Sequence, residues 1–359
     1  MPCGAWSQAL SVVSFRLTAQ GRPLEMDERH LPVPGPGQVL LGVAGCVLGQ
    51  NEVALISGAV APGCALPLVP GSGASGVVIR AGAGCEGLLG RPVLVPGVLP
   101  CGECELCRGG RANACPTGAR PGHDLDGGLA THLLVPGRSL VALEEPVGDC
   151  ELWELAAVSQ MVSSAFQCVL RAGIGRGDLA IFVGLGSVGS FGVQVAAAFG
   201  ATVFGVDVSP QRLQRLFGLG LTMGFDASER RTGGLRAAVE QECRERGLPK
   251  MGWKVFDMSG SCDGREAALG LMSPGGVVGI VGSPAGQATL DLSSLTRMDA
   301  SVFGSWGCSP VHFPAVLELL RSRKLALSPF VRRFALEDVN DVVRMVAGRV
   351  LNEIPVLVP

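Results

Sequence analysis

The sequence predicts an α/β protein of two domains, one rich in β-strands and one built on a doubly wound parallel sheet. A chain of 359 residues is too long for one ordinary hydrophobic core. Before Gln160 it has short strand-like runs with many glycines and prolines, as in HLPVPGPGQVLLGVAG. After Gln160, strand-like and helix-like runs alternate, which is typical of a parallel sheet. We therefore expect two domains of different architecture.

The parallel-sheet part can be followed run by run. The strand-like AIFVG ends at Gly184, and a second strand-like run, ATVFGVDV, follows Gly200. Further strand-like runs, KVFDMSG and GVVGIVG, lie on either side of the helix-like GREAALGLM, and the chain ends on the helix-like HFPAVLELLRSRK and the strand-like IPVLV. The uncharged stretch from Leu179 to Val206 is long enough to cross a bilayer, but its glycines divide it into strand, turn, helix and strand.

Four cysteines lie close together in the stretch CGECELCRGGRANAC. Their gaps of two, two and seven residues allow one short lobe to surround a single tetrahedral ion. The sequence therefore predicts a structural Zn²⁺ site whose ligands are Cys101, Cys104, Cys107 and Cys115. The chain has 13 cysteines, and the other nine are scattered among apolar neighbours, so we expect them to be buried small hydrophobic residues in a reducing compartment.

A glycine-rich motif, GLGSVG, follows the first strand-like run and opens a helix-like run. Gly184 permits a tight turn, Gly186 lets the backbone approach a pyrophosphate, and Gly189 allows the helix to pack closely on the strand. Asp207 ends the next strand, where its carboxylate can accept from ribose hydroxyls and repel a 2′-phosphate; NAD(H) is therefore favoured over NADP(H), although Arg212 can offset the repulsion. The expected cofactor-binding residues are Gly184, Gly186, Ser187, Val188, Gly189, Asp207 and Arg212.

The charge and the N-terminal sequence restrict the partners. A net charge of −2 gives no basic excess for nucleic acid or an anionic membrane, so the expected partner is a small molecule. The first residues lack the basic start and unbroken apolar core of a signal peptide, and we expect a cytoplasmic protein.

Four segments together resemble the medium-chain dehydrogenase/reductase superfamily of zinc alcohol dehydrogenase type: the four-cysteine loop, DGGLATHLLVP, GLGSVG and the strand ending in Asp207. The resemblance runs nearly end to end. Within the superfamily, GHDLDGGLATH, MGWKVFDMSG and GSWGCSPVHFPAVLELLRSRKLALSPFV are most similar to the branch that acts on coenzyme A thioesters, which includes 6-hydroxycyclohex-1-ene-1-carbonyl-CoA dehydrogenase. Less specific residues are similar to reductases that turn 3,3-dimethylacryloyl-CoA into isovaleryl-CoA.

The resemblance implies a domain arrangement. A GroES-like substrate domain would comprise residues 1–151 and 298–359, with the zinc lobe at about 95–116, and a Rossmann NAD-binding domain would comprise residues 152–297. It also implies a homodimer or homotetramer that assembles through the edge of the Rossmann sheet.

The resemblance also identifies the positions of a catalytic zinc. The superfamily binds that ion through a Cys-x-Thr/Ser-Asp motif, a Gly-His-Glu motif and a Cys or Asp before the central helix. Here these positions hold Gly49, then Ser72 and Gly73, and then Gln160, with a possible shift of one residue at the last. Such residues cannot supply the ligands that Zn²⁺ needs, and Cys46 nearby is a single ligand. We therefore expect no catalytic zinc.

Loss of the Lewis acid changes the expected chemistry. Alcohol oxidation needs a group that stabilises an alkoxide, whereas reduction of an α,β-unsaturated thioester by NADH needs only hydrogen-bond donors and a proton. Asn51, Ser72 and Gln160 are candidate donors to the thioester carbonyl, and His123 or Asp124 is the candidate proton donor. The chain has no tyrosine, which excludes a phenolic donor. Glu52 could act as an acid, but an ordinary solvated carboxylate is the favoured interpretation. The expected catalytic residues are Asn51, Ser72, His123 and Gln160.

Three functions remain open from the sequence. The first is NADH-dependent reduction of a short branched enoyl-CoA, such as 3,3-dimethylacryloyl-CoA. The second is NAD-dependent oxidation of a hydroxyacyl-CoA, with polar side chains in place of zinc. The third is dinucleotide binding without catalysis, because fold alone does not determine function.

Overall fold

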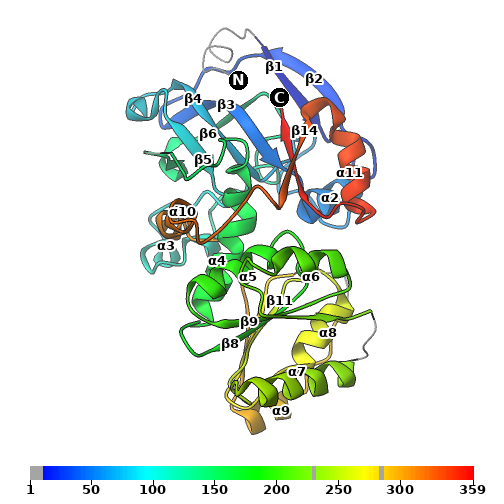
Figure 1. The fold of residues 1–359 in the computed structure, drawn as a ribbon. Coiled ribbons are helices and arrows are strands. Elements are labelled where there is room, and N and C mark those ends of the chain that lie inside the picture. The colour runs from blue at the N-terminus through cyan, green and yellow to red at the C-terminus, as the bar shows by residue number, and fades with distance from the viewer. Residues whose placement is uncertain (1–10, 145, 229–231, 283–286) are drawn as a thin grey trace. The chain divides into compact units, whose positions relative to one another are not determined.

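The structure is a computed structural model that describes residues 11–144, 146–228, 232–282 and 287–359. The chain divides into two compact units. The first comprises Met1–Ser163, Gly307–Glu318 and Leu327–Pro359, and the second comprises Ser164–Trp306 and Leu319–Ala326. The first unit is rich in β-strands and the second is built on a parallel sheet (Figure 1). The α/β fold class predicted from the sequence is confirmed.

A seven-stranded sheet organises the first unit and combines strands from both ends of the chain, drawn in blue and red in Figure 1. Its order is β14-β15-β3-β4-β5-β7, and β6 also pairs with β3. Only the β14–β15 pair is parallel. The strands are β3 (Gln38–Val47), β4 (Gly73–Ala81), β5 (Pro92–Val95), β6 (His132–Pro136), β7 (Val141–Ala142), β14 (Val331–Ala335) and β15 (Ile354–Val358). A separate antiparallel pair is formed by β1 (Ser11–Arg16) and β2 (Glu25–His30).

The core of the first unit surrounds β3, which is buried along nearly its whole length because it pairs with β4, β6 and β15. Val339, Val342 and Val346 form the buried face of one helix, α11. The α-helices lying wholly in this unit are α2 (Gln50–Ser57), α3 (Glu105–Arg108) and α11 (Val339–Ala347). The short 3-10 turns are η1 (Glu86–Leu88), η2 (Ala112–Ala114), η3 (Gly137–Ser139), η5 (Pro310–His312) and η6 (Leu336–Asp338), and η4 (Val158–Val162) is a π-helical turn.

The second unit is organised by a six-stranded sheet in which every pair is parallel. The order β10-β9-β8-β11-β12-β13 reverses direction at β8, and ligands of such sheets bind at the carboxyl ends of the strands at this point. The strands are β8 (Leu179–Val183), β9 (Thr202–Asp207), β10 (Met223–Asp226), β11 (Lys254–Asp257), β12 (Val277–Ile280) and β13 (Ser301–Gly304). The remaining helices are α4 (Ser163–Arg171), α5 (Gly189–Ala198), α6 (Pro210–Leu216), α7 (Thr232–Arg246), α8 (Cys262–Gly270), α9 (Leu292–Met298) and α10 (Phe313–Arg321).

The elements read from the sequence after Gln160 are confirmed. The uncharged stretch forms β8, the glycine turn, α5 and β9, and the later runs form β11, α8, β12, α10 and β15. No helix in the described part of the chain has the length and apolar character needed to cross a membrane.

Candidate functional site

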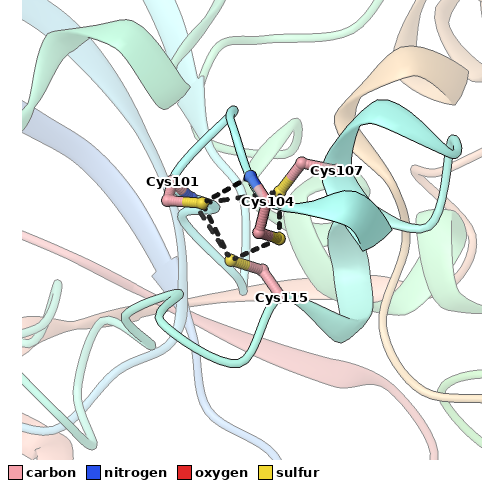
Figure 2. Close-up of side chains that lie close together, drawn as sticks. All are labelled: Cys101, Cys104, Cys107 and Cys115. Atoms are coloured by element: carbon pink, nitrogen blue, oxygen red, sulfur yellow. Dashed lines mark hydrogen bonds between the residues drawn. The ribbon is translucent and has the colours of Figure 1, made fainter.

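The four cysteines of the predicted knuckle come together in the first unit; we call them the cysteine cluster. Figure 2 shows their sulfur atoms converging between a loop and the short helix α3. All four sulfurs lie within 4.8 Å of one another, and four of the Sγ–Sγ distances are 3.4, 3.5, 3.8 and 3.9 Å. Tetrahedral Zn²⁺ with Zn–S bonds of about 2.3 Å separates its sulfurs by about 3.8 Å. The cysteine cluster therefore fits a structural zinc ion.

Backbone N–H groups donate hydrogen bonds to two sulfurs of the cysteine cluster. The Cys104 N–H donates to the Cys101 sulfur, and the Cys101 N–H donates to the Cys115 sulfur, each at 3.4 Å. The Thr117 hydroxyl, followed by backbone N–H groups, lowers the pKa of Cys101 to about 6, whereas burial raises the pKa of Cys107 to about 12. Zinc binding needs thiolates, so it must displace at least the Cys107 proton.

The glycine turn between β8 and α5 has the shape that a dinucleotide needs. Gly184 has a φ of +88°, and a Cβ there would lie 2.3 Å from the Ser259 Cα. A Cβ on Gly189 would lie 1.9 Å from the Gly184 carbonyl oxygen. In contrast, a Cβ on Gly186 would meet only Arg212, with Nη1 at 3.9 Å. The first and last glycines are thus required by packing, and the middle one leaves room for a ligand.

The N-terminus of α5 is open to an anion. Val188 is the N-cap of this helix and makes no side-chain capping bond, and Gly186, Ser187 and Val188 are all partly exposed. Uncapped N–H groups at a helix N-terminus attract phosphate. These residues fit the pyrophosphate of a dinucleotide.

Asp207 lies underneath the glycine turn. Its Oδ2 accepts from the Leu185 N–H at 2.6 Å, its Oδ1 accepts from the Ser209 N–H at 2.9 Å, and its side chain is only 3% exposed. Arg212 places Nη1 3.9 Å from Oδ1. Asp207 therefore holds the turn and Arg212 in place, and its contact with ribose hydroxyls stays a prediction.

In the first unit, Glu52 is the centre of a hydrogen-bond group that also includes Gly49 and Ser72. Glu52 Oε1 accepts from the Ser72 hydroxyl at 2.5 Å and from the Ser72 N–H at 3.1 Å, and Oε2 accepts from the Gly49 N–H at 2.9 Å. Glu52 is 3% exposed. The prediction of a solvated carboxylate is wrong, because Glu52 is the third residue of α2 and its side chain caps the helix by turning back to Gly49.

Ser72 sits between two glycines that are packed against other elements. Gly71 has a φ of +108°, and a Cβ there would lie 2.6 Å from the Cys46 sulfur. A Cβ on Gly73 would lie 3.1 Å from the Gln160 Cβ. Ser72 and Gln160, both predicted site residues, are therefore brought together with Glu52.

The positions that the resemblance assigns to catalytic-zinc ligands do not fit a metal. Gly49 offers no ligand, and the Met161 methyl group lies 2.8 Å from where a Cβ on Gly49 would be. Ser72 donates its proton to Glu52. Cys46 is completely buried, and burial, followed by the charge of Glu52, raises the pKa of its thiol well above the usual value. Among the described residues, the cysteine cluster is the one group of three or more His, Cys, Asp or Glu with the geometry of a metal site.

The other two predicted catalytic residues lie apart from this group. Asn51 is exposed on α2. His123 Nδ1 lies 2.7 Å from Arg120 Nη2 and 2.9 Å from Asp124 Oδ1. Nδ1 can accept from Arg120 or donate to the Asp124 carboxylate, depending on the tautomer, and Nε2 is a buried atom with no hydrogen-bond partner among the described residues. Arg120 also holds the pKa of Asp124 well below its usual range, so Asp124 stays ionised.

The sequence reasoning named Glu52 but misjudged its burial, and it missed Met161. Glu52 follows the N-cap residue Gly49 by three positions, and this capping-box spacing was the sequence signal for its role. For Met161, the only sequence signal was its position next to Gln160. Which side chain faces Gly49 depends on the π-helical turn, which the sequence did not predict.

Comparisons with known proteins agree with this arrangement. Two family profiles match the chain, "Zinc-binding dehydrogenase" at residues 187–322 and "Alcohol dehydrogenase GroES-like domain" at residues 35–145. An alcohol dehydrogenase of Geobacillus stearothermophilus is 24% identical over 92% of this chain and 94% of its own length. An L-threonine 3-dehydrogenase of Pyrococcus horikoshii is 28% identical over 89% and 90%. The crystal structure of an NAD-dependent alcohol dehydrogenase is 26% identical, with a TM-score of 0.86 over 97% of this chain and 99% of that one.

Proposed function

The chain belongs to the medium-chain, zinc-type alcohol dehydrogenase superfamily and is an NAD(H)-dependent oxidoreductase, and from this premise we propose that it works without a catalytic zinc. Its proposed reaction is the reduction by NADH of the C=C bond of a short branched α,β-unsaturated acyl-CoA. A test substrate of this class is 3,3-dimethylacryloyl-CoA, whose product is isovaleryl-CoA.

One observation carries the proposal: the Met161 methyl group fills the space beside Gly49, where the resemblance places a metal ligand. A zinc ion supplies several kcal/mol of charge stabilisation to an alkoxide. Without it, oxidation of an unactivated alcohol is disfavoured. A conjugated thioester is less demanding, because the charge that develops during its reduction is spread over an enolate that hydrogen bonds can stabilise.

The proposed reaction is balanced with one hydride and one proton. Bound NADH supplies the hydride. The hydride adds to Cβ of the substrate, and the C=C electron pair moves toward the thioester carbonyl. Cα then takes a proton that comes ultimately from solvent. The chain's own side chains near Gly73 include Gln160, whose Cβ lies 3.1 Å from where a Cβ on Gly73 would be, and Ser72, whose hydroxyl donates to Glu52. Gln160 is proposed to donate to the thioester carbonyl.

A second candidate is the oxidation of a hydroxyacyl-CoA, and the 2.5 Å hydrogen bond from Ser72 to Glu52 favours it. A hydroxyl that donates to a carboxylate can take a proton from a substrate alcohol and pass its own to the carboxylate. The named relatives are alcohol and L-threonine dehydrogenases, which supports this direction of chemistry.

The test measures both reactions with the purified full chain. NADH consumption is followed with 3,3-dimethylacryloyl-CoA, and NAD⁺ reduction with 6-hydroxycyclohex-1-ene-1-carbonyl-CoA. With deuterated NADH in ordinary water, the proposal requires deuterium at Cβ and a solvent proton at Cα of isovaleryl-CoA. Turnover of the hydroxyacyl-CoA alone supports the second candidate, and turnover of neither contradicts both.

A further inference from the structure

We propose that Ser72 and Glu52 form a proton relay, in which Ser72 exchanges a proton with the substrate and Glu52 stores it. The inference rests on the proposed function in one respect, namely that hydride transfer in this chain is coupled to proton exchange with the substrate. It holds for either of the two candidate reactions, because a relay passes a proton in both directions.

Ser72 is the partly exposed residue whose hydroxyl donates to the buried Glu52 carboxylate. All three contacts of Glu52 given above are with donors, and two of them come from Ser72. Glu52 is 3% exposed, whereas Ser72 is partly exposed. The Ser72 Oγ keeps its lone pairs while its proton lies on the Glu52 side. It is therefore able to accept a proton from a substrate as it donates its own.

The Ser72 hydroxyl is held in a fixed position. Its backbone N–H is bonded to the same carboxylate oxygen as its hydroxyl. The backbone on either side is confined, because a Cβ on Gly71 would lie 2.6 Å from the Cys46 sulfur and one on Gly73 would lie 2.8 Å from Val47 Cγ2. A relay needs such preorganisation, since a misplaced group loses most of its effect.

Met161 completes the site as an apolar cover. It comes from the π-helical turn η4, is 6% exposed, and places its methyl group beside Gly49, whose N–H is bonded to Glu52. Turns of this kind are frequent at functional sites. A thioether in this position keeps water and cations away from the carboxylate, so Glu52 exchanges protons with Ser72.

The proton balance can be written for each reaction. In the oxidation of a hydroxyacyl-CoA, the alcohol proton passes to Ser72, the Ser72 proton passes to ionised Glu52, and the C–H hydride passes to NAD⁺. In the reduction of an enoyl-CoA, Cα takes the Ser72 proton, protonated Glu52 replaces it, and solvent later restores the Glu52 proton. Ser72 is neutral before and after each turnover.

The decisive variants are Ser72→Ala, Glu52→Gln and the double variant, with Ser57→Ala as the matched control on the exposed side of the same helix. Each single change should lower kcat/KM about 100-fold, the effect typical of one general acid or base. Because the two groups act as one unit, the double variant should be no worse than either single variant. Ser72→Thr, which keeps the hydroxyl, should recover part of the activity.

The pH profile distinguishes a relay from a structural hydrogen bond. Oxidation needs ionised Glu52, so wild-type kcat/KM should fall as the pH is lowered, whereas reduction needs protonated Glu52, so it should fall as the pH is raised. In either reaction, Glu52→Gln should remove this pH dependence of kcat/KM. Cys46 is the titratable neighbour that interacts with Glu52, and its raised pKa keeps it neutral at the acidic limb. Unchanged profiles in Ser72→Ala and Glu52→Gln, or additive losses in the double variant, overturn the relay.

An infrared measurement keeps the outcome independent of turnover. The difference spectrum between wild type and Glu52→Gln identifies the infrared band of the Glu52 carboxyl group. This band should shift in Ser72→Ala, because the 2.5 Å hydrogen bond from Ser72 to Glu52 is lost. No shift overturns the relay whatever the substrate. A shift without turnover of either thioester supports the Ser72–Glu52 pairing and contradicts the proposed function.

Discussion

Met161 closes the space beside Gly49, with its Cε atom 2.8 Å from the position that a Cβ on Gly49 would occupy. The resemblance to the superfamily places Gly49 and Gln160 at two ligand positions of a catalytic zinc. The structure places the neighbour of Gln160 against Gly49, so a side chain with no affinity for Zn²⁺ fills the gap. A glycine at position 49 and a methionine at position 161 are thus matched in packing, because the methyl group occupies the space that a side chain at position 49 would need.

Metal uptake in redesigned variants tests this relationship. The double variant Gly49→Cys/Ser72→His supplies two ligands but keeps Met161, and we expect it to hold no more zinc than the wild type. Adding Met161→Cys removes the obstructing methyl group and supplies a third ligand, so the triple variant should bind one further zinc ion per chain. Zinc would be measured by mass spectrometry of the dialysed proteins. A second equivalent in the double variant contradicts the role given to Met161.

The cysteine cluster should determine the stability of the first unit. Cys104→Ser removes one of four ligands, and we expect loss of the zinc and a fall in Tm of about 5–15 °C, since metal binding at such sites contributes several kcal/mol to folding. Differential scanning calorimetry with and without a chelator measures this. Cys150→Ser, which lies outside the cysteine cluster, is the matched control and should keep both zinc and Tm. Equal behaviour of the two variants would rule out a structural metal.

The three glycines of the turn should respond differently to alanine. Gly189→Ala puts a Cβ 1.9 Å from a carbonyl oxygen, and Gly184→Ala adds left-handed strain, so each should lower the free energy of unfolding by about 2–4 kcal/mol. Gly186→Ala has space and should leave Tm unchanged while raising the Kd for NADH about tenfold, or about 1.4 kcal/mol. Calorimetry and NADH fluorescence titration separate the effects. Tight NADH binding by Gly186→Ala would argue against the ligand position.

Asp207 and Arg212 should set the preference between the two dinucleotides. Asp207→Asn removes a charge that opposes a 2′-phosphate, so the preference for NADH over NADPH should narrow by about tenfold. The same change places an amide N–H₂ against a backbone N–H and should cost about 1–3 kcal/mol of stability. In that background Arg212→Ala should weaken NADPH binding. If the Kd ratio is the same in all three proteins, neither residue selects the cofactor.

The sequence was most informative where local pattern and chemistry coincide. GLGSVG lies between β8 and α5 as expected because glycine is required at the φ of +88° of Gly184 and at the close approach of Gly189. The cysteine spacing determined the cysteine cluster because a four-ligand lobe tolerates few other geometries. The alternation of runs after Gln160 predicted a parallel sheet, and the structure has one.

The candidate catalytic group could be predicted only in part. Ser72 and Gln160 were identified from aligned positions, and they do lie on either side of Gly73. Glu52 was misjudged because burial of a carboxylate depends on long-range contacts, here the packing of β4 against the start of α2. Met161 could not be found from pattern, since a π-helical turn changes which side chain faces inward. The capping-box spacing of Glu52 was visible in the sequence, but neither its burial nor the π-helical turn can be found from a single-sequence pattern.

Zinc content per catalytically active chain is the most direct test of the central claim, that this oxidoreductase works without a catalytic metal. We expect one zinc ion per chain in protein that turns over its thioester substrate at full rate, with that ion held by the cysteine cluster. Two zinc ions per active chain, with activity lost in proportion to removal of the second, would contradict the account.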